Sequence, residues 1–116
     1  MFKLSKKESF FWPVKGAIPV DGGDYAEFDF QAELKRLPQS KLDDLVRKLT
    51  AEKTELTLKQ VASDLLVGWK GVMDEAGEKE LTFIPETKKQ VLEVAGVAGI
   101  IVDAYFEALK GGRVKN

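Results

Sequence analysis

The chain has 116 residues, of which 44% are hydrophobic and 32% charged, and its net charge is −1. This length and composition are typical of one soluble globular domain and do not indicate a basic surface for nucleic acid. The sequence contains no cysteine and no histidine, which excludes disulfides, thiolate chemistry and the most frequent general base and metal ligand.

The first predicted element is a β-hairpin over residues 10–30. Apolar residues occupy alternate positions from Phe10 to Val20 and again from Ala26 to Phe30, which is the period of a strand with one buried face. The segment 21–24, Asp-Gly-Gly-Asp, is a strong turn signal. Two prolines, Pro13 and Pro19, remove ladder donors and predict that the first strand lies at a sheet edge or is interrupted.

Helices are predicted from residue 31 onward. A first helical stretch covers residues 31–37 and ends at Pro38, and a short helix follows with apolar residues at i, i+3, i+4 and i+7. Residues 57–73 have the pattern of a longer amphipathic helix, capped by Thr57 and Gln60 and carrying Trp69 on its apolar arc. Its apolar arc consists of Leu58, Val61, Ala62, Leu65, Leu66, Trp69, Val72 and Met73.

A polar turn and two further helices complete the prediction. Residues 74–80 are rich in carboxylates but lack the spacing of a calcium-binding loop, so a solvated turn is the better interpretation. Pro85 suits the first turn of the next helix. The last helix, residues 97–109, is apolar nearly all round apart from one strip, Asp103, Glu107 and Lys110.

Two interpretations of this last helix remain open. It is either fully buried at the centre of the core, or one of its faces is covered by a partner. In the second case the partner-binding residues are Ala98, Val102, Tyr105, Phe106 and Leu109.

The sequence contains no recognisable catalytic or ligand-binding motif. Without histidine or cysteine no nucleophile is visibly activated, and no glycine-rich phosphate-binding motif occurs. We therefore expect a protein that is not an enzyme and that has no catalytic residue, metal or cofactor. No apolar run is long enough for a bilayer, and we expect a cytoplasmic location.

The predicted fold class is α+β and mostly helical, with an N-terminal hairpin followed by a small bundle of four to five helices. One domain is expected to span residues 1–116, with the hairpin at about 10–30, the helices at about 31–109 and a loose tail at 111–116.

Four stretches carry a resemblance to a known family. They read F-W-P-V, P-V-D-G-G-D-Y-A-E-F-D-F-Q-A-E-L-K-R-L-P, D-L-L-V-G-W-K-G-V-M-D-E-A-G-E and V-A-G-V-A-G-I-I-V-D-A-Y-F-E-A-L. In this order and spacing the chain resembles the tail assembly chaperones of long-tailed bacteriophages and prophages. The resemblance implies a mostly helical protein without cofactor that shields the tape measure protein in the host bacterial cytoplasm.

The resemblance also implies a second partner, the tail tube protein. In many family members a ribosomal frameshift adds an extension that recruits this protein, and the present chain would be the short form. Val114-Lys115-Asn116 can be encoded with the slippery heptamer A AAA AAC, so we expect such a heptamer and an overlapping −1 reading frame. Reading the DNA tests this expectation.

The predicted function is thus that of a chaperone without catalysis, which self-associates and binds neither nucleic acid nor membrane. The alternative is a structural tail or connector subunit, similar to a tail terminator, that stays in the finished particle.

Overall fold

The structure is a computed structural model that describes residues 1–52 and 56–111. Its first two strands, β1 (Ser9–Val20) and β2 (Asp24–Lys35), form a long antiparallel hairpin. The turn between them is a short 3-10 segment, Asp21–Gly23, in which Gly22 and Gly23 have φ angles of 83° and 77°. Only glycine adopts these angles at little cost, and the predicted hairpin turn is confirmed.

A third strand, β3 (Leu66–Lys70), joins the other side of β2, so the sheet is antiparallel with the order β1-β2-β3. β1 is an edge strand, as its prolines predicted. Pro13 and Pro19 both occupy odd-numbered positions of β1, which pairs with β2 without a register shift, so their backbone nitrogens face the same side of the strand. Their missing N–H groups therefore lie on the free side of β1, where they limit pairing with another strand.

The predicted fold, a hairpin followed by a bundle of four to five helices, is wrong. Over the described residues, 1–52 and 56–111, the structure has a three-stranded antiparallel sheet and four helices. The helices are α1 (Gln39–Thr50), α2 (Leu58–Leu65), α3 (Pro85–Glu93) and α4 (Val97–Lys110). Strand residues replace predicted helix at two places, residues 31–35 and 66–70.

The first error lies at the end of β2. Residues 31–35 continue the strand, because Ala32 and Leu34 extend the alternating buried positions of Phe30. All three side chains are buried on the face that the helices cover. The period of two thus runs beyond the point at which the helix was predicted to begin.

The second error lies in the helix predicted over residues 57–73. Its capping box is confirmed: the Gln60 amide donates to Thr57 Oγ1 over 3.1 Å and the Thr57 amide donates to Gln60 Oε1 over 2.9 Å. The helix ends at Leu65, however, and β3 follows directly. A Cβ atom at Gly68 would crowd the side chain of Glu33 on β2 and lie only 3.2 Å from Glu33 Cβ. This glycine therefore permits the close approach of β3 to β2, in place of a helix interior that glycine weakens.

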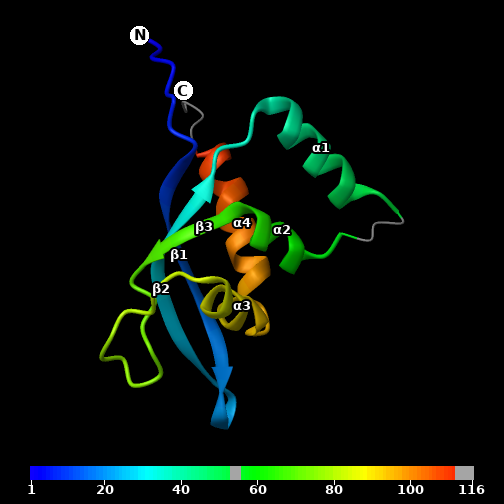
Figure 1. The fold of residues 1–116 in the computed structure, drawn as a ribbon. Coiled ribbons are helices and arrows are strands. Elements are labelled where there is room, and N and C mark those ends of the chain that lie inside the picture. Colours follow the sequence, from blue (N-terminus) through cyan, green and yellow to red (C-terminus); the bar gives the residue numbers. More distant parts are fainter. Residues whose placement is uncertain (53–55, 112–116) are drawn as a thin grey trace.

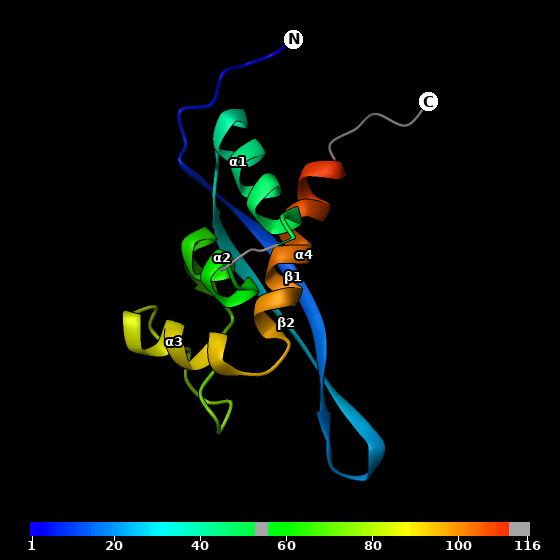
Figure 2. The ribbon, with the colours of Figure 1, turned by 90° about the vertical axis from the view of Figure 1, so that its right-hand side faces the viewer.

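The helices cover only one face of the sheet (Figures 1 and 2). α2 and α4 lie against the strands and against each other, and α3 packs on both of these helices. The largest fully buried side chains are Tyr105, Leu34, Leu65, Leu66, Ile101 and Val14. The core therefore lies between the sheet and the pair α2 and α4.

The opposite face of the sheet is open to solvent and polar. Lys15, Asp29 and Lys70 are exposed on it, and the Lys70 ammonium lies 4.2 Å from the centre of the Phe11 ring. Figure 2 also shows that the tip of the hairpin projects beyond the helices.

The polar turn after β3 is closed by its own carboxylates. Asp74 Oδ1 accepts a hydrogen bond from the Glu78 amide over 2.9 Å, and Glu80 Oε1 accepts one from the Gly71 amide over 2.5 Å. The chain then returns to the core at Leu81, whose carbonyl accepts from the Trp69 indole N–H over 2.8 Å. Gly111 follows the last residue of α4, and the rest of the predicted loose tail lies outside the described residues.

Candidate protein-binding surface

The residues predicted to bind a partner do not share one exposed face. Their positions range from the core to the surface: Ala98 is 9% exposed, Val102 3%, Tyr105 1% and Leu109 43%, and Phe106 is partly buried. Val97 and Ile101, on the other side of α4, are buried as well. Both apolar sides of α4 thus pack inside the domain, which corrects the division into a core face and a partner face.

Tyr105 connects α4 to the sheet. Its hydroxyl donates a hydrogen bond to the Lys35 carbonyl at the end of β2, over 3.0 Å, and its ring stacks on Phe10 of β1 with centroids 6.1 Å apart. Burial raises the pKa of the Tyr105 phenol above its usual range, so the folded domain favours the neutral, hydrogen-bonding form.

A shallowly packed apolar surface is found instead on α1. This helix contains no buried residue, whereas each of the other three helices contains at least one. Three leucines, Leu42, Leu45 and Leu49, are partly buried against the edge of the core, and Val46 beside them is 42% exposed. These four residues, called the α1 stripe below, have the i, i+3, i+4, i+7 spacing of one helix face.

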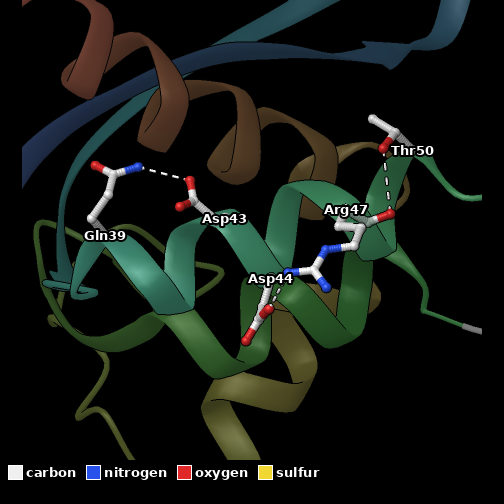
Figure 3. Close-up of polar contacts among 5 residues, drawn as sticks. All are labelled: Gln39, Asp43, Asp44, Arg47 and Thr50. Atoms are coloured by element: carbon white, nitrogen blue, oxygen red, sulfur yellow. Dashed lines mark hydrogen bonds and ion pairs between the residues drawn. The ribbon is translucent and has the colours of Figure 1, made fainter.

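The polar side chains of α1 do not attach it to the rest of the domain. Figure 3 shows that their contacts lie within the helix. Gln39 Nε2 donates to Asp43 over 2.9 Å, Arg47 pairs with Asp44 over 2.5 Å, and the Thr50 hydroxyl donates to the Val46 carbonyl over 2.9 Å. Exposed ion pairs of this kind contribute at most about 1 kcal/mol. The shallow packing of the leucines is therefore the main attachment of α1.

A groove of about 310 Å³ separates α1 from α2. Its apolar lining comes from Leu37, Leu45, Leu56, Val61 and Leu65. Its charged border carries both signs, with Lys35, Lys41 and Lys48 beside Asp44 and Asp64. The groove and the α1 stripe form one candidate surface for an apolar helix.

A second cleft, of about 630 Å³, lies between α2 and α3. Its apolar residues are Phe83, Ile84, Pro85 and Leu92, and its cations are Lys59, Lys88 and Lys89; no carboxylate lines it. The Lys88 ammonium lies 5.7 Å from the centre of the Phe83 ring, and desolvation lowers the pKa of this lysine. Lys59 is ion-paired with Glu93. This lysine-rimmed cleft suits an apolar group flanked by negative charge.

The sequence predicted a short helix from the spacing of the α1 stripe, but it did not predict a binding surface there. Periodicity identifies which face of a helix is apolar, but it does not tell how deeply that face packs. One feature of the sequence could have indicated shallow packing. The apolar face of α1 is small, with only four aliphatic side chains and no aromatic one.

Comparison with known proteins places the chain among prophage proteins. A family model described as YdaY prophage protein matches residues 23–110, from the hairpin turn to the end of α4. Because the match covers most of the sequence, the chain belongs to the YdaY prophage protein family. No curated protein and no solved structure matches the chain significantly.

Within residues 1–52 and 56–111, none of the helices is both long enough and apolar enough to cross a bilayer.

Proposed function

We propose that this prophage protein is a tail assembly chaperone that binds and shields the tape measure protein in the host cytoplasm, without catalysis. The observation that carries the proposal is the α1 stripe, an amphipathic helix face with no buried residue beside an apolar groove. Membership of a prophage family and the resemblance of four sequence stretches to tail assembly chaperones support the same function.

The proposed mode of binding is helix against helix. An amphipathic helix is recognised by apolar anchors at i, i+3, i+4 and i+7, and Leu42, Leu45, Val46 and Leu49 provide such a row. A client helix on this row would cover apolar surface on both proteins, which contributes about 25 cal/mol per Å² of buried area. The client would leave when tail tube subunits compete for the same apolar surface.

Coexpression with the tape measure protein tests the proposal. We expect the tape measure protein to be largely insoluble alone and soluble together with this chain, with which it should copurify. Equal solubility in the presence and absence of this chain would contradict the chaperone function.

A substitution in the α1 stripe should separate binding from folding. Val46→Asp places a negative charge on the surface where the client is proposed to bind. Because the substitution replaces an exposed side chain, the free energy of unfolding should change by no more than about 0.5 kcal/mol. The soluble yield of the tape measure protein should fall severalfold. Ser40→Asp adds the same charge to an exposed position of the same helix and should leave the yield unchanged. If both variants protect the client equally, the α1 stripe is not the binding site.

The second candidate function is a structural tail or connector subunit. The broad open sheet face and the projecting hairpin favour it, because both could contact neighbouring subunits of a particle. Mass spectrometry of purified particles distinguishes the two functions, since a chaperone should be absent and a subunit should be present in a fixed number of copies.

A further inference from the structure

The projecting end of the hairpin presents apolar side chains that the domain itself does not cover. Tyr25 is 66% exposed and Val20 is 48% exposed, on either side of the turn Asp21–Gly23. The turn that joins β1 and β2 lies beyond the helices in both views of the ribbon (Figures 1 and 2). An exposed tyrosine and valine at the end of a rigid arm are suited to contact another molecule.

The same arm carries charge of one sign. Residues 16–34 contain no lysine or arginine, and their acidic residues are Asp21, Asp24, Glu27, Asp29 and Glu33. Asp21 and Asp24 directly adjoin Val20 and Tyr25 at the tip. The hairpin tip therefore combines two apolar side chains with two carboxylates.

The lysine-rimmed cleft between α2 and α3 has the complementary chemistry. Its floor is apolar, its rim carries three lysines, and no carboxylate lines it. Lys59 is ion-paired with Glu93, whereas Lys88 and Lys89 form no ion pair within the described residues and feel only the more distant charges of Asp64 and Glu93. Desolvation disfavours the ammonium form of Lys88, and a docked carboxylate would restore the balance.

We propose that this chain self-associates by docking the hairpin tip of one copy into the lysine-rimmed cleft of a second copy. Tyr25, which pairs with Pro19 and so lies on the opposite face of the hairpin from Val20, packs on Phe83 and Pro85, while Asp21 and Asp24 pair with Lys88 and Lys89. The groove beside α1 is a poorer acceptor for this tip, because two carboxylates, Asp44 and Asp64, line it. Because tip and cleft are different surfaces of one chain, the contact either closes between two copies or continues into a ring or chain.

Sedimentation velocity at rising protein concentration tests the proposal. We expect the wild-type chain to associate and the association to weaken with added salt, since it depends on exposed charges. Lys88→Glu with Lys89→Glu, and Asp21→Lys with Asp24→Lys, should each weaken association at least about tenfold, because like charges then oppose each other. Lys41→Glu with Lys48→Glu makes the same charge change at the α1 groove and should leave the association unchanged.

Restoration makes the test specific. The two reversed pairs combined in one chain, or the two doubly substituted chains mixed, again bring opposite charges together and should recover association. Circular dichroism establishes that each variant is folded. A strictly monomeric wild-type chain, a cleft reversal without effect, or a combined variant that stays monomeric would overturn the proposal. The proposal would also be overturned if reversal of Lys88 and Lys89 abolished tape measure binding and left self-association intact, because the cleft would then bind the client and not the hairpin tip.

Discussion

Replacing Tyr105 with alanine should lower the free energy of unfolding by about 3–5 kcal/mol, the usual cost of removing a buried aromatic side chain. The ring is 1% exposed and packs against Phe10 and Phe106, with centroids 6.1 and 5.8 Å away. Small domains are stable by only about 5–15 kcal/mol. A large fraction of the Tyr105→Ala molecules should therefore be unfolded at moderate urea concentration. Far-ultraviolet circular dichroism measures this fraction directly.

Leu109→Ala is the matched control for this substitution. Leu109 lies on the same helix and was predicted to share the partner face, but it is 43% exposed, so its truncation should cost much less than that of Tyr105. Tyr105→Phe isolates the hydroxyl, whose loss leaves the Lys35 carbonyl without this donor and should cost about 0.5–1.5 kcal/mol. If Tyr105→Ala were as stable as the wild type and lost only association, the partner-face interpretation of Tyr105 would be right after all.

Trp69→Ala should have an effect of similar size, about 3–5 kcal/mol. Trp69 belongs to β3, where it pairs with Ala32, and its ring meets Phe83 edge to face at 4.8 Å. Its indole N–H also donates to the Leu81 carbonyl, which links the edge strand to the segment leading into α3. Truncation should therefore loosen β3 and residues 81–84 together.

Val67→Ala provides the comparison within the same strand. Val67 is 39% exposed, so its truncation should cost much less than that of Trp69. Urea titration should be followed by circular dichroism for both variants, because Trp69→Ala removes the tryptophan whose fluorescence would report folding at this site. Equal destabilisation by the two substitutions would contradict the assignment of Trp69 as the anchor of β3.

The sequence predicted the elements that short-range patterns determine. The glycine turn after Val20, the capping box at Thr57 and the proline that opens α3 depend on residues within a few positions of one another. The edge position of β1 followed from its two prolines. Each of these features has a physical cause that acts locally, and each was found in the structure.

The strand β3 could not be predicted in the same way. Leu65, Leu66 and Val67 form a short continuous apolar run, and runs of this kind are ambiguous between a helix and a strand. The decision depends on pairing with β2, more than thirty residues earlier, and on the place that Gly68 leaves for Glu33. Tertiary contacts of this kind override local propensity.

The candidate surface was missed for a related reason. An apolar helix with a second apolar face suggested a partner for α4, but β1 of the same chain covers that face through Phe10. The shallowly packed stripe belongs instead to α1, for which the sequence pattern predicted only a short helix. Burial depth is a property of the assembled domain and not of the periodicity.

The proposed client shielding and the proposed self-association use different surfaces of the domain. The α1 stripe faces the groove toward α2, whereas the lysine-rimmed cleft lies between α2 and α3. Several copies joined through their hairpin tips would present several α1 stripes, and linked binding sites increase affinity for a long client beyond that of a single site. The two activities can therefore be removed separately by substitution.

Aggregation of the purified tape measure protein after dilution from denaturant, followed by light scattering, tests the proposed chaperone function directly. We predict that the wild-type chain suppresses the scattering in proportion to its amount, that Ser40→Asp does the same, and that Val46→Asp suppresses it poorly. Undiminished scattering in the presence of a severalfold molar excess of the folded wild-type chain would contradict the proposed function.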